Sequence, residues 1–74
     1  MSTKPQRDIE KGYSKPEFVA KLRRLADSIE SDSRFDIQIA GERIYVPVHA
    51  TFTIEHERSG TEEEIEFQVK WRPE

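Results

Sequence analysis

The sequence predicts an α+β fold in which one N-terminal amphipathic helix packs on a four-stranded antiparallel β-meander, in two layers. A capped segment with helical apolar spacing comes first, and shorter segments with alternating apolar residues follow it. The three glycines lie at joints between these segments. The 74 residues leave room for one domain. We place it at residues 9–72, after a disordered tail at residues 1–8 and before a short tail at residues 73–74.

The helix has a clear predicted start and end. Ser14-Lys15-Pro16-Glu17 is a capping box with Pro in the first turn, and the turn-forming run Ser31-Asp32-Ser33 follows the last apolar residue of the helical pattern. The expected core face of the helix consists of Phe18, Val19, Leu22, Leu25, Ala26 and Ile29. Residues 9–13 fit either an extra short N-terminal strand at the sheet edge or a lead-in to the helix.

Two half-buried strands follow the helix, at residues 35–39 and 44–48, because apolar and polar residues alternate in both. A two-residue loop at Gly41-Glu42, with Gly first, predicts a type II′ hairpin. This register pairs Ile39 with Ile44, Ile37 with Val46, and Phe35 with Val48.

The last two strands flank the predicted turn Arg58-Ser59-Gly60-Thr61, a register that pairs Ile54 with Ile65 and Phe52 with Phe67. An odd-length loop centred on His49 would pair Val46 with Phe52 and complete the meander; a single long bent strand is the alternative. The helix is expected to cover the apolar face of the sheet, with Trp71 closing the end of the core.

Composition excludes several classes of protein. The formal net charge is only -3, and no apolar run is long enough to cross a membrane or to serve as a signal peptide. The absence of Cys excludes disulfides and thiolate nucleophiles and fits a reducing compartment. We therefore expect a folded cytoplasmic protein without membrane contact.

The most distinctive feature of the sequence is an acidic sheet face. Alternation places five carboxylates on the solvent side of the last two strands: Glu55, Glu57, Glu62, Glu64 and Glu66. Like charges that face each other across a hairpin are unfavourable, so this face could be kept for a basic protein partner or a hard cation. The simpler interpretation is a solvated face that keeps the domain soluble.

Other chemistry finds less support in the sequence. The strand pleat places His56 on the opposite face from Glu55 and Glu57, so we expect no metal site. The sequence contains no positioned nucleophile and no cofactor motif, so we do not expect an enzyme. His56 is expected near Glu63. A pI of about 5.4 disfavours nucleic acid, whose phosphates could reach only the basic helix residues Lys15, Lys21, Arg23 and Arg24.

Residues 9–72 resemble the amphi-Trp domain, a small and largely uncharacterised prokaryotic family. The resemblance rests on five stretches of the chain: the helix start Ser14-Lys15-Pro16-Glu17, the helix segments Leu22-Arg23-Arg24-Leu25-Ala26 and Ile29-Glu30-Ser31, Pro47, and the terminal strand from Glu64 to Trp71. Family members often have Gly where this chain has Asp32-Ser33. The resemblance implies a domain type without an established activity, cofactor or catalytic residue.

The expected function is therefore that of a small non-catalytic protein-binding or adaptor module, which uses the acidic sheet face or a free sheet edge. Cation or small-molecule binding at the carboxylates is the alternative. Free edges could also pair with a second copy, so we expect a monomer or a weak homodimer.

Overall fold

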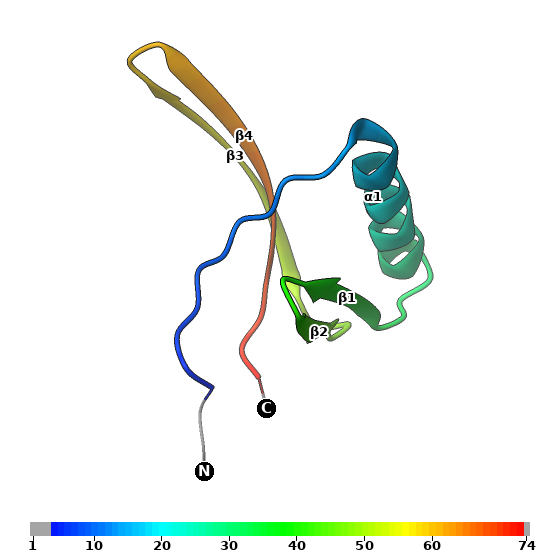
Figure 1. Cartoon of the computed structure of the whole chain (residues 1–74). Coiled ribbons are helices and arrows are strands. Elements are labelled where there is room, and N and C mark those ends of the chain that lie inside the picture. The colour runs from blue at the N-terminus through cyan, green and yellow to red at the C-terminus, as the bar shows by residue number, and fades with distance from the viewer. Residues whose placement is uncertain (1–3, 74) are drawn as a thin grey trace.

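A computed structural model describes residues 4–73, so the predicted tails lie partly outside the described residues, at residues 1–3 and 74. The chain forms one helix and four strands, in the order α1 (Lys15–Glu30), β1 (Phe35–Ile39), β2 (Glu42–Val46), β3 (Thr51–Ser59) and β4 (Glu62–Lys70). The predicted α+β class is confirmed. Figure 1 shows α1 and the long β3–β4 hairpin spreading apart from a shared base at β1 and β2.

Helix α1 begins and ends as its sequence predicts. The Glu17 backbone N–H donates to Ser14 Oγ, while the Ser14 backbone N–H donates back to the Glu17 carboxylate at 3.2 Å. At the other end, the backbone N–H groups of Asp32 and Ser33 donate to the carbonyls of Ile29 and Ser28, as in a Schellman motif. Asp32 takes φ +53°, the left-handed conformation that Gly adopts more easily.

The β1–β2 hairpin turns at Ala40-Gly41, one residue earlier than predicted. Both residues have positive φ (+48° and +85°), the pattern of a type I′ turn. The ladder pairs Phe35 with Val46 and Ile37 with Ile44, so the predicted register is wrong by two residues. The observed register places two buried side chains, Phe35 and Val46, opposite each other, whereas the predicted one would pair Phe35 with the exposed Val48.

The β3–β4 hairpin also pairs two residues away from the prediction. Its loop is Gly60-Thr61, with Gly60 at φ +60°, and the ladder pairs Ile54 with Phe67 and Phe52 with Val69. This tighter loop extends the ladder by two pairs toward the tip, one of which joins Arg58 to Glu63. Both register errors are even, so the side chains still alternate between the faces that the sequence predicts.

The four strands do not form a single sheet. They form two two-stranded antiparallel sheets, β1–β2 and β3–β4, so the predicted pairing of β2 with β3 is wrong. Between them the Ala50 backbone N–H donates to the Pro47 carbonyl at 3.3 Å, which redirects the chain, and Pro47 itself has no N–H to donate. The second hairpin therefore leaves the plane of the first.

The core is smaller than predicted. The buried apolar side chains are Phe35, Val46 and Ala50, and the partly buried side chains that pack against them are Leu25, Ile37, Ile44, Val69 and Trp71. Trp71 lies just beyond β4 at the edge of this core. No residue of α1 is buried. Within residues 4–73 the backbone of α1 lies close to β1 but not to β3 or β4. The expected packing of the helix on the sheet is therefore present only at β1, at the base of the molecule.

The segment before α1 forms no strand within its described residues, 4–14, which answers the question that residues 9–13 left open. Arg7 nevertheless anchors it, because its guanidinium donates to the Ile39 carbonyl and lies 3.6 Å from the Glu42 carboxylate. Within the described part of the chain, no helix has the length and apolar character that crossing a membrane requires.

Candidate functional site

The five predicted glutamates lie on one face of the β3–β4 hairpin, which we call the acidic face (Glu55, Glu57, Glu62, Glu64 and Glu66). The ladder pairs Glu55 with Glu66 and Glu57 with Glu64, so like charges face each other at two successive positions of the same face. Carboxylate oxygens of Glu55, Glu57 and Glu66 all lie within 4.8 Å of one another. Glu62 lies at the tip, opposite Ser59.

Mutual repulsion shifts the pKa of one carboxyl group on this face, that of Glu64. The negative charge of Glu66 raises the pKa of Glu64, and partial desolvation and the charges of Glu57, Glu10 and Glu55 act in the same direction. A raised pKa means that the folded chain holds this carboxylate in an unfavourable field. The closely spaced carboxylates therefore give the acidic face a negative electrostatic potential.

Within residues 4–73, the side-chain hydrogen bonds to the carboxylates of this face come from one neutral residue, Gln68. Gln68 Nε2 donates to Glu55 Oε1 at 3.4 Å and to Glu66 Oε2 at 3.2 Å, and its own carbonyl accepts from Thr53 Oγ1 at 2.7 Å. The arginine of the hairpin, Arg58, pairs instead with Glu63 at 3.0 Å, on the opposite face. Gln68 thus orients two carboxylates without cancelling their charge.

The two histidines lie apart from this face. His56 Nε2 is 3.0 Å from Glu63 Oε1, on the apolar side of the hairpin, as the sequence predicted. His49 Nε2 lies 3.3 Å from the Arg72 carbonyl, near the base. The cluster of Glu55, Glu57 and Glu66 therefore offers only carboxylate oxygens, a donor set that suits Ca²⁺ or Mg²⁺ better than Zn²⁺.

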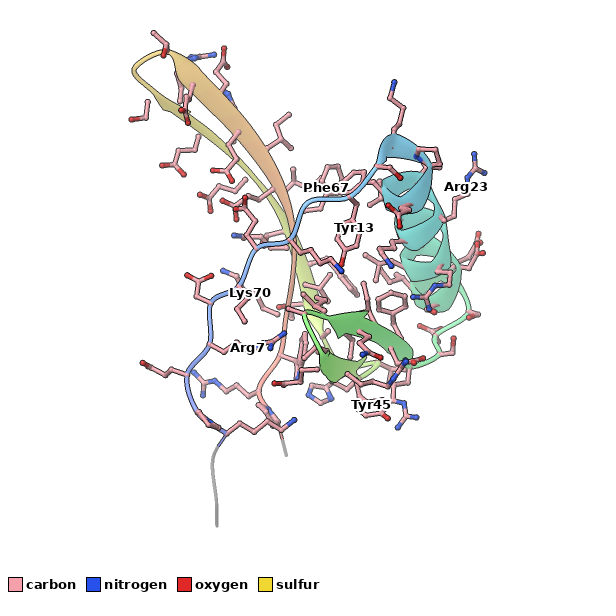
Figure 2. All side chains as sticks on the ribbon, in the orientation of Figure 1. Arg7, Tyr13, Arg23, Tyr45, Phe67 and Lys70 are labelled. Atoms are coloured by element: carbon pink, nitrogen blue, oxygen red, sulfur yellow. The ribbon has the colours of Figure 1, made fainter. Side chains whose placement is uncertain are left out.

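The basic residues of α1 do not form one surface. The Arg24 guanidinium lies 5.0 Å from the centre of the Phe35 ring and donates to the Asp36 carbonyl at 3.1 Å, while Lys21 lies 4.9 Å from the centre of the Tyr13 ring. Arg23 projects from the side of α1 that faces away from the β3–β4 hairpin (Figure 2). Two of the four cations considered for phosphate binding are thus engaged within the chain.

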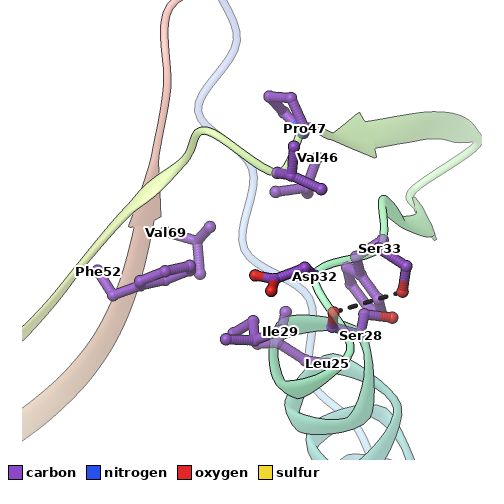
Figure 3. Close-up of a pocket in the computed structure, with 11 residues that line it drawn as sticks. Leu25, Ser28, Ile29, Asp32, Ser33, Val46, Pro47, Phe52 and Val69 are labelled. Atoms are coloured by element: carbon purple, nitrogen blue, oxygen red, sulfur yellow. Dashed lines mark hydrogen bonds between the residues drawn. The ribbon is translucent and has the colours of Figure 1, made fainter.

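A small cavity lies at the base, between the end of α1 and the start of the second hairpin. Its volume is about 50 Å³, and its apolar lining includes Leu25, Ile29, Val46, Phe52 and Val69 (Figure 3). Sites for metabolites are usually about 300–1,000 Å³ and contain several converging polar groups. This cavity is several times smaller than such sites.

A second surface was not anticipated from the sequence. Four large side chains assigned to the core, Phe52, Ile54, Ile65 and Phe67, are exposed on the side of the hairpin opposite the acidic face. Their alternation shows that they share a face, but the same pattern is produced whether that face is covered or open. No signal in the sequence distinguishes the two cases.

The chain matches a known protein family. A family model described as the Amphi-Trp domain matches residues 1–74, the whole chain. No curated protein and no solved structure matches the chain.

Proposed function

Because the chain belongs to the Amphi-Trp domain family, a domain type with no activity attached, we propose its function from its own surface. It is a small, non-catalytic protein-binding or adaptor module of the cytoplasm, and its acidic face binds a protein with a basic surface. The absence of Cys agrees with a reducing compartment.

One observation carries this proposal: the double cross-strand pairing of Glu55 with Glu66 and of Glu57 with Glu64. Paired like charges oppose folding, and a Thr or Gln at any of these positions would avoid the cost. A basic partner would turn the repulsion into a favourable interaction and speed association through electrostatic steering. The free edges of β3 and β4 offer an extended peptide a second route onto the same hairpin.

The test compares two variants with equal changes in net charge. Glu57→Gln with Glu64→Gln removes two of the five negative charges of the acidic face, and Asp27→Asn with Glu30→Gln removes two negative charges from α1. Each folded protein is used to capture partners from a lysate of the source organism, and the affinity of any retained protein is then measured by calorimetry. We expect only the acidic-face variant to lose the partner, with an affinity that falls as salt rises.

Retention of the same proteins by both variants would contradict the proposal. The carboxylates would then serve solubility, and a peptide-binding edge would be the next candidate.

Cation binding is the second candidate function, because three carboxylates converge within 4.8 Å. Ca²⁺ takes six to eight oxygen ligands, so these side chains would supply only part of its shell and solvent the rest. Calorimetry with Ca²⁺ and Mg²⁺ on the wild type and on Glu55→Gln is the test. Binding no tighter than millimolar, or binding unaffected by the substitution, rules this candidate out.

A further inference from the structure

The strongest unexplained feature is the apolar side of the β3–β4 hairpin, which we call the apolar face (Phe52, Ile54, Ile65 and Phe67). These side chains are 52%, 68%, 66% and 69% exposed. Ile54 and Phe67 are direct cross-strand partners, so the four side chains form one continuous patch. At its distal end the patch is bordered by a polar group in which His56 and Arg58 both contact Glu63. An exposed apolar patch with a polar border is typical of a protein interface.

A second uncovered surface lies on α1. Phe18 and Leu22, four residues apart on the same side of the helix, are 54% and 40% exposed. Figure 2 shows Phe67 and Tyr13 on the side of the hairpin that faces α1. Within the described residues, however, the backbone of α1 reaches neither β3 nor β4. One molecule therefore leaves two apolar surfaces uncovered, one on the hairpin and one on α1.

The total surface is too large for a compact protein of this size. The accessible area is 6893 Å², whereas a compact monomer of 8.7 kDa exposes about 4,700 Å². The radius of gyration is 14.0 Å, against about 11 Å for a compact domain of this length. The extended residues 4–14 account for part of the surplus of roughly 2,000 Å², and the two apolar surfaces add to it. Obligate homodimers bury about 1,000–2,500 Å² on each subunit, so the surplus has the size that a second subunit covers.

Area and length indicate that the missing partner is another copy of this chain. Strands of nine residues span about 30 Å and a helix of 16 residues about 24 Å, so the two elements match in length. A two-fold axis parallel to the hairpin would place the hairpin of each copy beside the helix of the other.

We propose that two copies of this chain form a symmetric homodimer in which the apolar face of each packs against Phe18 and Leu22 of the other. The core that each molecule leaves incomplete is then shared between the two. Both acidic faces stay on the outside, so this proposal goes beyond the binding of a basic partner and does not depend on it.

The first test is the mass of the full chain by sedimentation equilibrium across the micromolar range, with an expected value of twice 8.7 kDa. Ile54→Ser should raise the dimer dissociation constant by about 30-fold or more, because the change removes a central apolar contact from both copies. Thr53→Ser, one residue away and on the opposite face, is the matched control and should leave it unchanged. On α1, Leu22→Ser should weaken the dimer, and Arg23→Ser should not.

A second experiment locates the interface even if a serine variant fails to fold. Because the chain has no Cys, single Leu22→Cys and Phe67→Cys variants can be mixed and treated with a short bismaleimide. We expect a cross-linked heterodimer from this mixture and not from Arg23→Cys mixed with Phe67→Cys. A wild type that remains a monomer throughout overturns the proposal and leaves the apolar face to a different protein or to a lipid surface. A dimer that withstands Ile54→Ser and Leu22→Ser and gives no selective cross-link overturns it as well.

Discussion

Two phenylalanines of this chain provide a direct test of how the hairpin is packed. Phe35 is 6% exposed in the core, and Phe67 is 69% exposed on the apolar face. Both lie in strands, so replacing each with Ala changes the same side chain in the same backbone conformation. The difference between the two losses in the free energy of unfolding therefore reports their difference in burial.

The expected losses differ severalfold. A fully buried Phe→Ala change costs about 3–5 kcal/mol, and Phe35 also loses the contact of its ring with Arg24, worth about 0.5–1 kcal/mol. Phe67 has about a third of its surface covered, so Phe67→Ala should cost only about 1 kcal/mol in the monomer. The whole domain is stabilised by roughly 4–11 kcal/mol, so Phe35→Ala brings it close to unfolding and Phe35→Leu serves as a milder variant.

The assay is urea unfolding followed by Trp71 fluorescence and by circular dichroism, at the lowest protein concentration that gives a signal. Dimer formation would add to the cost of Phe67→Ala as the concentration rises, so the series is repeated at higher concentration. Equal losses for the two Ala variants at the lowest concentration would refute the reasoning, because they would show that the hairpin packs into the core of a single molecule.

Three further predictions concern single positions. Ala40→Asn should raise the free energy of unfolding by about 1 kcal/mol, because Asn tolerates the left-handed conformation better than Ala; a decrease in the urea midpoint would contradict this. Ser14→Ala should lower the free energy of unfolding by about 1 kcal/mol, because the helix loses its N-cap. Hydrogen bonds from Ser14 lower the pKa of Glu17, so NMR titration of this variant should show the Glu17 pKa rising toward its ordinary value of 4.5. Repulsion from Glu66 raises the pKa of Glu64, so the charged form of Glu64 is less favourable in the folded chain than in the unfolded chain. Glu64→Gln should therefore raise the free energy of unfolding at pH 7. This gain should disappear as the pH falls below 4.5, where Glu64 is protonated in both states. A gain that is equal at pH 7 and pH 4 would show that charge is not its cause.

The local features of the fold could be predicted because they depend on neighbouring residues. The capping box determined the start of α1, and strand alternation identified the glutamates that share a face. The turn at Ala40-Gly41 could not be predicted from turn chemistry, because it forces an Ala into positive φ to bring Phe35 opposite Val46. That gain lies in the core, which local preferences do not describe.

The assembly of the elements could not be predicted for a related reason. Alternation shows that Phe52 and Phe67 share a side of the hairpin, but it does not show what covers that side. The turn that follows Pro47 separates the two hairpins and leaves α1 over β1 alone. The candidate site was accessible to sequence reasoning because it needs only one hairpin, whereas the apolar face depends on how three elements meet.

The two short turns, and the missing ladder between β2 and β3, also determine how this chain folds. Each ladder closes a loop of only two residues, so backbone pairing can form early and at little entropic cost. Because no backbone ladder joins the two hairpins in the described part of the chain, the distal half of β3–β4 can open while α1 and β1–β2 stay folded. Amide hydrogens near Gly60 should then exchange through local opening, those around Phe35 only through global unfolding, and a ligand bound at the tip would be detected as slower exchange confined to the hairpin.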